Sequence, residues 1–352
     1  MWKETLKGKR VLVTGHTGFK GSWLVAWLDS LGAKVWGLSL EPDTEPSLFR
    51  EARLEALLEG HMIGDICDSE IMDRAVERAD PDLIVHLAAQ PLVRRSYREP
   101  HLTFSTNVLG TLNLLESIRK RGKPCSAVLI TTDKVYRNVE QVWGYRECDP
   151  LGGDDPYSAS KAAAEITIHS YRRSFFQPGS GIRVASARGG NVIGGGDWSQ
   201  DRIVPDLVSA LIAGKELEVR SPFSVRPWQH VLDLHSGYLQ LAARLLTEER
   251  PEWCEAWNFG PAVGDDVTVG ELVESFIGVW GSGGWRDVSG GEHPHEAKIL
   301  RLAIDKSVSE LGWRPTWGVS DTVEKTAGWY RDHARGDDAL LLMRRDIRDF
   351  TS

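Results

Sequence analysis

Two short segments of the sequence bring proton-exchanging side chains together. Thr132, Asp133 and Lys134 place a hydroxyl, a carboxylate and an ammonium side by side, directly after a run of apolar residues. Tyr157 and Lys161 stand four residues apart in YSASK, ahead of the helix-favouring AAAE, so we expect them to share one helix face. An ammonium beside a phenol favours the phenolate and lowers the phenol pKa from about 10 towards neutrality. The pair can then accept a proton from a hydroxyl group of a substrate.

A glycine-rich turn lies near the beginning of the chain. Gly15, Gly18 and Gly21 stand three residues apart in TGHTGFKG, between a strand-like run and a helix-like segment. Such a turn lets the backbone approach a pyrophosphate closely and aims helix N-terminal N–H groups at the anion, and Lys20 adds a positive charge. The alternative is an ordinary glycine-rich connection, but the alternation of strands and helices around it favours a dinucleotide site.

The end of the second strand-like run bears on which dinucleotide binds. Ser39 stands where an aspartate usually contacts the ribose hydroxyl, so the direct signal for NAD is missing. Glu41, Asp43 and Glu45 follow, with no basic residue before Arg50, and a field of this sign repels a 2′-phosphate. We therefore expect NAD rather than NADP.

Asp65 follows the third strand-like run, in GDICD. Its carboxylate is placed to accept a hydrogen bond from the adenine amino group of a dinucleotide. The alternative is that it caps a helix beginning near Ser69. The two roles are compatible at this stage.

The elements that must position these residues alternate between strand and helix through the first half of the chain. This pattern predicts an α/β fold with a parallel sheet covered by helices on both faces. We expect strands at 10–15, 34–40, 61–66, 81–89, 127–132 and 182–192, and helices at 19–31 and 105–121. Further helices are expected at 201–214, 229–246 and 268–280, with one more within 310–333.

Composition narrows the classes of protein. The chain has 352 residues and a net charge of -8, and no cluster of lysine and arginine suggests nucleic-acid binding. No apolar stretch approaches the ~18 residues that a membrane span requires, so we expect no membrane partner and a cytoplasmic location. The four cysteines are scattered without metal-ligand spacing, so no metal site is expected.

Motifs along nearly the whole chain carry a family resemblance. They are TGHTGFKG, HLAAQPLVRRSYREP, TNVLGT, YSASK, GGNVIGGGDW, RPWQHVLD and LGWRP. With them the chain resembles the extended short-chain dehydrogenase/reductase superfamily and, within it, the nucleotide-sugar 4,6-dehydratases. GHTGFKGSWL, TTDKVY and HPHEAKILRL are similar to the branch that acts on CDP-glucose, whose dTDP-glucose relatives have Thr-Asp-Glu in place of Thr132, Asp133 and Lys134.

The resemblance implies an architecture. We expect a Rossmann-type doubly wound parallel sheet with a smaller C-terminal substrate-binding lobe. Residues 1–190 would form the NAD-binding domain that carries the catalytic residues. Residues 191–352 would form mainly the nucleotide-sugar-binding lobe, with some segments returning to the first domain. A homodimer through the helices near 101–121 and 157–175 is also implied.

The resemblance further implies a reaction and a role for each catalytic residue. The hexose is oxidised at C4, water leaves across C5 and C6, and hydrogen returns to C6, as in deoxysugar synthesis for lipopolysaccharide O-antigen. Tyr157 would be the base at O4, Thr132 a hydrogen-bond partner of the C4 oxygen, and Asp133 the acid for the C6 hydroxyl. Lys134 would be the base at C5; alternatively it stabilises the enolate while another group takes the proton. Lys161 would contact the ribose of the cofactor.

Binding residues follow from the same resemblance. The expected contacts to NAD are Gly15, Thr17, Gly18, Phe19, Lys20, Gly21, Asp65, Ile66, Leu87, Ala88, Ala89, Asn107, Thr131, Tyr157 and Lys161. The expected contacts to CDP-glucose are Gln90, Asn191, Arg202, Arg226, His295 and Arg301. The arginines suit a diphosphate because the guanidinium pairs with two phosphate oxygens at once.

Two other classes of function share many of these features. A nucleotide-sugar 4-epimerase has the same turn and the same Tyr/Lys pair, but it needs no acid at C6, so Asp133 speaks against it. A non-catalytic NAD(P)-sensing scaffold keeps the nucleotide fold while the reactive pair typically decays, and here both Tyr157 and Lys161 remain.

Overall fold

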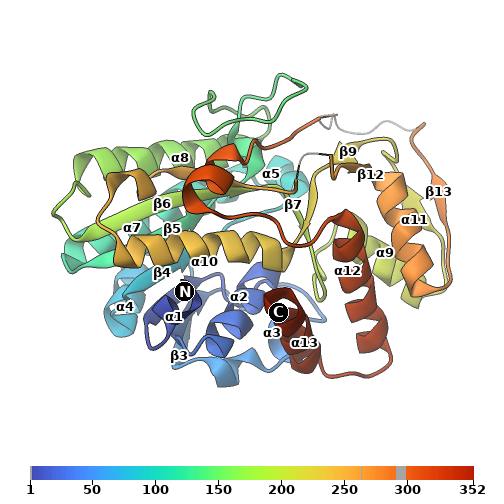
Figure 1. Ribbon diagram of the computed structural model, residues 1–352, viewed down its shortest axis with the longest axis horizontal. Helices are drawn as coiled ribbons and strands as arrows, with labels where there is room; N and C mark the ends of the chain where they lie inside the picture. Colours follow the sequence, from blue (N-terminus) through green and yellow to red (C-terminus); the bar gives the residue numbers. More distant parts are fainter. Residues whose placement is uncertain (1, 263, 291–298) are drawn as a thin grey trace.

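The computed structural model describes residues 2–262, 264–290 and 299–352. Its centre is a seven-stranded sheet in the order β11-β6-β5-β4-β1-β2-β3, with every neighbouring pair parallel (Figure 1). The strands are β1 (Arg10–Thr14), β2 (Lys34–Ser39), β3 (Gly60–Ile63), β4 (Leu83–His86), β5 (Cys125–Ile130), β6 (Ile182–Gly189) and β11 (Ala256–Phe259). The expected fold class is confirmed.

Alternation of side chains along the strands divides the core into two layers. Val11 and Val13 of β1 join one apolar cluster, while Leu12 between them joins the other. In β5, Val128 and Leu129 separate in the same way, because successive side chains of a strand point to opposite faces. Both faces of the sheet are therefore apolar and need helices to cover them.

Helices cover the two faces. One face carries α4 (Ser69–Ala79), α7 (Gly110–Arg121) and α8 (Pro156–Ser174), and the other carries α2 (Phe19–Ser30) and α10 (Val231–Thr247). The helix α1 (Trp2–Leu6) packs against α10, and α13 (Ala339–Thr351) packs against α2, whereas α12 (Val319–Ala334) packs against α11 (Val269–Trp280) and β10 (Trp228–His230). Short helices follow β2 and β4, namely α3 (Leu48–Glu51), α5 (Val93–Arg98), α6 (Pro100–Phe104) and the π-helical turn η2 (Ser105–Leu109) that leads into α7.

A smaller lobe lies beside the carboxyl ends of the strands (Figure 1). It contains α9 (Ile203–Ile212), α11 (Val269–Trp280) and three two-stranded pairings. The paired strands are β7 (Asn191–Ile193) with β10 (Trp228–His230), β9 (Val225–Arg226) with β12 (Val267–Thr268), and β8 (Leu217–Val219) with β13 (Trp285–Asp287). Within the described residues, no helix is both long and apolar enough to span a membrane.

One predicted strand is wrong in an informative way. The run 182–192 is not continuous, because β6 ends at Gly189 and β7 leaves the sheet to pair with β10. The chain thus turns from the sheet into the lobe at Gly190. The strand β11, which completes the sheet beside β6, was not among the expected strands. The other predicted strands and helices are present, with ends that differ by a few residues, and the helix expected at 105–121 begins earlier, in α6.

Candidate active site

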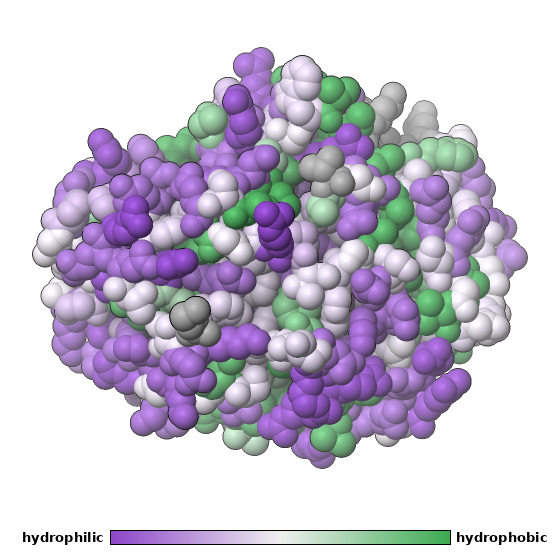
Figure 2. Space-filling view, viewed as in Figure 1, coloured by the Kyte–Doolittle hydropathy of each residue, from purple (hydrophilic) through white to green (hydrophobic). Residues whose placement is uncertain are grey.

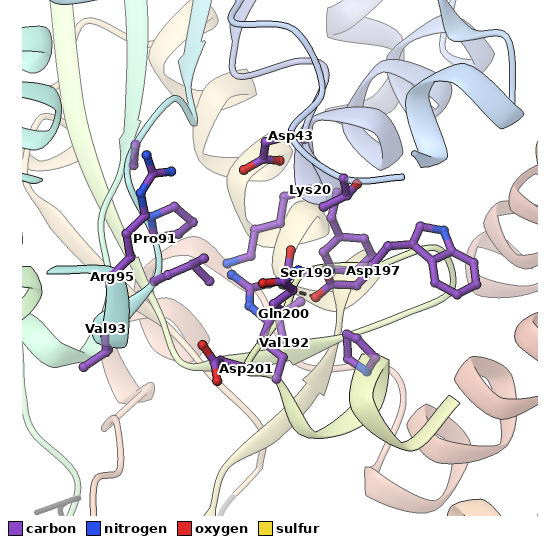
Figure 3. A pocket seen from close by; sticks show the side chains of 18 of the residues that line it. Lys20, Asp43, Pro91, Val93, Arg95, Val192, Asp197, Ser199, Gln200 and Asp201 are labelled. Carbon is purple, nitrogen blue, oxygen red and sulfur yellow. Dashed lines mark hydrogen bonds and ion pairs between the residues drawn. The ribbon is translucent and has the colours of Figure 1, made fainter. Parts of the chain in front are cut away.

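A cavity of about 850 Å³ opens between the carboxyl ends of the strands and the lobe (Figure 3). Parallel sheets bind ligands at this edge where the strand order reverses, which here lies between β1 and β4. Its wall includes most of the expected site residues: Gly15, Thr17, Gly18, Phe19, Lys20, Gly21, Asp65, Ile66, Leu87, Ala88, Ala89, Thr131, Thr132, Asp133, Lys134, Tyr157, Lys161, Asn191, Arg202 and Arg226. The topology therefore gathers residues that lie up to two hundred positions apart into one cavity.

The glycine-rich turn is shaped by two close approaches. Gly15 has a φ of 75°, and a Cβ there would come within 2.7 Å of the backbone nitrogen of Ala88. A Cβ on Gly21 would collide with the carbonyl oxygen of Gly15. Gly18 stands at the N-terminus of α2 and is exposed to the cavity. The turn thus packs against β4 while the N–H groups at the beginning of α2 remain available to an anion, which fits a dinucleotide pyrophosphate.

The residues after β2 are arranged for a cofactor without a 2′-phosphate. Thr17 Oγ1 lies 2.7 Å from Ser39 Oγ and fixes the end of the strand against the turn. Arg50, the nearest base, is held by Glu41 and Glu45 at 3.3 and 3.4 Å. The two glutamates line the cavity, so this part of its wall is acidic. Such a wall favours a ribose hydroxyl over a phosphate.

The position of Asp65 separates its two expected roles. The helix α4 is capped by Asp68, whose carboxylate accepts hydrogen bonds from the backbone N–H groups of Glu70 and Ile71. Among the described residues, the carboxylate of Asp65 accepts a hydrogen bond only from the N–H of Cys67, at 2.9 Å, and Asp65 lines the cavity. The capping alternative is therefore wrong for Asp65.

The strand end of β5 holds the acidic centre of the site. The hydroxyl of Thr132 donates to Asp133 Oδ1 at 2.9 Å, and Lys134 Nζ lies 3.7 Å from the same oxygen. The other oxygen, Oδ2, is buried and has no hydrogen-bond partner within the described part of the chain. It faces Gly190, where a Cβ would lie 3.3 Å away. The carboxyl group is thus held by one oxygen and free at the other.

Tyr157 and Lys161 project from α8 beside this strand end. Asp155 caps the helix by accepting from the N–H of Ser158 at 2.9 Å, and Lys161 donates to the carbonyl oxygen of Ile130 at 3.1 Å. Burial raises the pKa of Tyr157 to about 12, and the hydroxyl of Thr132 opposes the shift.

The direction of this shift corrects an expectation. The sequence predicts a pKa below 10 for Tyr157, but burial raises the pKa, Asp133 acts in the same direction, and Thr132 and Arg202 oppose the shift only in part. Burial also lowers the pKa of Lys161 to about 8, against the effect of Glu165. Tyr157 therefore stays protonated until a further positive charge enters the cavity.

A second polar cluster lies directly behind the first. Glu165 of α8 accepts from Thr131 Oγ1 at 2.6 Å and from Ser186 Oγ at 2.8 Å. Arg188 of β6 pairs with both of its carboxylate oxygens, at 3.0 and 2.9 Å. Arg188 also donates to the hydroxyl of Tyr136 at 2.8 Å. This buried network fixes α8 to β5 and β6 and so positions Tyr157 and Lys161.

The basic residues expected to bind substrate lie in different places. Arg202 begins α9 and donates to Asp197 Oδ2 at 2.8 Å, and both residues line the cavity. Arg226 lines it from β9. Arg301 is not among the residues that line the cavity, because it pairs with Asp266 at 2.7 Å and donates to the carbonyl oxygen of Val142. His295 lies outside the described residues.

Two other expected contacts support the cavity wall from behind. The side chain of Gln90 is buried and bonded to Thr103 Oγ1 and to the backbone of Leu92. Asn107 binds the backbone of Gln90 with both ends of its amide and donates to Ser160 Oγ at 2.8 Å. Neither residue lines the cavity, so in this geometry both hold the loop after β4 against α8.

Sequence reasoning missed several residues of the cavity wall. Asp197 pairs with Arg202, and Arg95 and Asp206 also line the cavity. The motif GGGDW contains Asp197 and was the available signal, although its pairing with Arg202 depends on the turn of the chain into the lobe. Within the described ranges, no cluster of three or more potential ligands could hold a metal ion.

Comparison with known proteins gives consistent results. Residues 12–326 match the family model described as GDP-mannose 4,6 dehydratase. The chain is 47% identical over 354 residues to a CDP-glucose 4,6-dehydratase of Salmonella typhimurium, with 99% of this chain and 98% of the relative covered.

Two solved structures extend the likeness. A dTDP-glucose 4,6-dehydratase of Streptomyces venezuelae, with NAD and TYD bound, has a TM-score of 0.76 and 26% identity, covering 94% of this chain and 99% of its own. A UDP-glucose 4-epimerase of Thermus thermophilus, in complex with NAD, has a TM-score of 0.75 and 27% identity, covering 93% and 99%. The overall fold is thus shared by dehydratases and an epimerase, and only the side chains of the cavity can distinguish these activities.

Proposed function

The chain belongs to the GDP-mannose 4,6 dehydratase family, and from this premise we propose that it is an NAD-dependent CDP-glucose 4,6-dehydratase. It converts CDP-D-glucose to CDP-4-dehydro-6-deoxy-D-glucose and water. The observation that carries the proposal is the buried Asp133 Oδ2, which lacks a hydrogen-bond partner among the described residues and belongs to a carboxyl group lining the cavity. A 4-epimerase has no step that uses an acid at this position.

The cofactor site fits NAD. The close approaches of Gly15 and Gly21 leave the beginning of α2 open to a pyrophosphate, and the acidic wall after β2 disfavours a 2′-phosphate. When bound, NAD would supply an acceptor of the electron pair for oxidation at C4, the donor for reduction at C6, and one further positive charge in the cavity.

Each proton transfer of the reaction is then assigned to one residue of the chain. Tyr157 takes the proton of the C4 hydroxyl, and the hydroxyl of Thr132 donates to the C4 oxygen. Once C4 is a ketone, the C5 proton is acidic; Lys134 removes it and returns a proton to C5 when C6 is reduced. Asp133 protonates the C6 hydroxyl so that it leaves as water. Asp133 can do this because its Oδ2 has no hydrogen-bond partner among the described residues and can carry the proton, while Thr132, which donates to Oδ1 in this structure, turns its hydroxyl to the C4 oxygen of the bound sugar.

The role of Lys134 is the least constrained of these. Its side chain is 34% exposed, against 2% for Asp133, so fewer contacts fix its position. In Lys134→Met, we expect C5 of the substrate to stop exchanging its hydrogen with deuterated solvent, as seen by mass spectrometry. Continued exchange without loss of water would instead make Lys134 a group that stabilises the enolate.

The experiment that tests the function is an assay of product mass. Purified protein with NAD is incubated separately with the glucose derivatives of CDP, dTDP, UDP and GDP. We expect a product lighter by one water, formed fastest from CDP-glucose. A product of equal mass would indicate an epimerase, and no change with any of the four would indicate a non-catalytic protein.

The assembly we propose is a homodimer through the face formed by η2 and α8. Leu109 of η2 and Ile166 of α8 are 50% and 60% exposed, and Phe104 and Phe175 lie exposed on neighbouring segments. Two such faces can pack as a four-helix bundle. Ile166→Asp should shift the mass measured by light scattering to that of a monomer, whereas Leu341→Asp, at an exposed position of α13, should not.

The cellular context follows from the substrate. We propose a cytoplasmic enzyme, because CDP-glucose and NAD are soluble intracellular metabolites. Its 6-deoxy product suits deoxysugar synthesis of the kind used for lipopolysaccharide O-antigen. Fractionation of cells followed by the product-mass assay would test the location.

A further inference from the structure

Lys20 lines the cavity and has no hydrogen-bond or ion-pair partner among the described residues. It is the second residue of α2, and its side chain extends into the cavity towards the segment that contains Asp197 and Ser199 (Figure 3). Across the ranges that the structure describes, its ammonium makes neither a hydrogen bond nor an ion pair. Burial lowers its pKa to about 7, and Arg202 and Lys161 act in the same direction.

Of the two carboxylates that act on Lys20, Asp197 is paired with Arg202, and Asp133 uses one of its two oxygens. Asp197 accepts from Arg202 at 2.8 Å and from the N–H of Ser199 at 3.1 Å. Asp133 accepts from Thr132 and lies 3.7 Å from Lys134. Lys20 and Arg202 line the same cavity and repel each other, and an anion bound between them would remove this repulsion. The arrangement therefore indicates an anion site.

Two diphosphates enter this cavity under the proposed function, and the neighbours of Lys20 distinguish them. The dinucleotide pyrophosphate is expected at the turn between Gly15 and Gly21, where backbone N–H groups receive it. The charged groups that act on Lys20 come instead from the catalytic strand end, from α8 and from the 197–202 segment. These elements surround the place where the sugar must react.

We propose that Lys20 binds the diphosphate of the nucleotide sugar together with Arg202, and does not serve the pyrophosphate of the dinucleotide. This inference rests on the proposed function and reassigns a residue that the sequence placed at the cofactor. Lys20 fixes the phosphate next to the hexose, so it sets the position of C4 and C6 relative to Tyr157 and Asp133. Lys20 is thus a substrate-binding residue that contacts the phosphate bonded to the hexose and not the phosphate bonded to the nucleoside.

Titration calorimetry with CDP, CMP and NAD tests the proposal directly. Lys20→Met keeps the length of the side chain and removes its charge, and Lys34→Met serves as the matched control, because Lys34 is exposed and does not line the cavity. We expect Lys20→Met to weaken CDP binding about 10- to 100-fold, as for loss of one charged hydrogen bond. CMP and NAD should bind within about threefold of the wild type, and Lys20→Arg should recover part of the affinity for CDP.

Other outcomes overturn the proposal. Weaker binding of NAD with unchanged binding of CDP would return Lys20 to the cofactor. Equal loss for both ligands would show that the substitution disturbs the cavity in general, and no loss for either would show that Lys20 binds no phosphate. If the wild type binds none of CDP, UDP, dTDP and GDP, the proposed function itself fails; tight binding of CDP by Lys20→Met overturns only this inference.

Discussion

Two buried polar clusters flank the end of β5 and differ in how completely their groups are paired. Behind the strand, both oxygens of Glu165 accept from Arg188, and each accepts one further hydroxyl. In front, Asp133 Oδ2 is buried without a hydrogen-bond partner within the described part of the chain. Buried polar groups in folded proteins are nearly always satisfied by the protein itself. The cluster of Glu165 and Arg188, in which all carboxylate oxygens are paired, therefore has a structural role. The group around Asp133, with one unpaired oxygen, is interpreted as a ligand-binding site.

The two clusters also differ in how their surroundings shift the pKa values of their ionisable groups. Although burial opposes it, Arg188 and the two hydroxyls lower the pKa of Glu165, so the carboxylate is ionised and fully used. In front, burial lowers the pKa of Lys20 to about 7, with Arg202 and Lys161 acting in the same direction, and Asp133 and Asp197 offset this only in part. Changes behind the strand should thus affect mainly stability, and changes in front mainly turnover.

The largest effect is expected in front, from Tyr157→Phe. Loss of the proton acceptor should lower kcat about 10⁴-fold, at the upper end of what a general base contributes. The free energy of unfolding should change by less than ~1 kcal/mol, because only one hydroxyl is removed. Steady-state kinetics and urea unfolding measure the two quantities. If Tyr157→Phe lost activity because it unfolds, the proposed difference between residues that determine turnover and residues that determine stability would be contradicted.

The next effect is expected behind the strand, from Glu165→Ala. Removing one partner of a buried ion pair leaves the Arg188 guanidinium uncompensated and should cost about 3–5 kcal/mol of unfolding free energy. Replacing Glu165 and Arg188 together, with Met at both positions, should cost less than the single change. If Glu165→Ala instead unfolded like the wild type while losing turnover, the cluster behind the strand would not be scaffold.

A smaller effect on turnover is expected from Asp133→Asn. The amide keeps the shape of the carboxyl group but cannot deliver a proton to the C6 hydroxyl, so kcat should fall about 10²-fold. Stability should hold or rise, since the change removes a carboxylate whose Oδ2 the described protein leaves unpaired. The same variant should still bind CDP. Full activity in Asp133→Asn would assign the acid to another group.

The smallest effect is expected from Asp346 of α13, which tests whether an unpaired carboxylate oxygen is enough to indicate function. Like Asp133, Asp346 has a buried Oδ2 without a hydrogen-bond partner among the described residues. Unlike Asp133, it does not line the cavity. Burial raises its pKa to about 6, against the effect of Arg345. The folded state therefore holds this proton to a higher pH than the unfolded state, whose pKa is about 3.9.

Stability from this proton is present at low pH and is lost as the pH rises through about 6. Relative to Asp346→Asn, the wild type should lose about 2 kcal/mol of unfolding free energy between pH ~4.5 and ~7.5. The turnover of Asp346→Asn should equal that of the wild type, because Asp346 does not line the cavity and its unpaired oxygen cannot contact a ligand there. Parallel stability curves for the two proteins would show that Asp346 stays ionised.

The sequence predicted the sheet well because its signals are local. Apolar runs and the glycine turn identify β1 to β5 and the edge at which the site lies. It failed at Gly190, since the run 182–192 has uniform strand propensity and the exit of β7 depends on a partner, β10, that lies forty residues away. The strand β11 is short and gains its identity only from pairing with β6.

The site was predictable where residue type alone decides, as at Thr132, Asp133, Tyr157 and Lys161. It was less predictable where burial or pairing decides. The pKa of Tyr157 moves upward because desolvation outweighs the charges that the spacing suggested. Arg301 has the chemistry of a phosphate ligand, but Asp266 holds it away from the cavity. Which partner a charged side chain selects depends on the folded structure and cannot be predicted from its residue type.

The most direct test of the account uses CDP-glucose labelled with deuterium at C4, with the wild-type protein and a small amount of NAD. The account predicts a product lighter by one water that carries the deuterium on its methyl carbon, because C4 is oxidised and C6 reduced within one cavity. An isomer of unchanged mass, or a methyl group without deuterium, would contradict it.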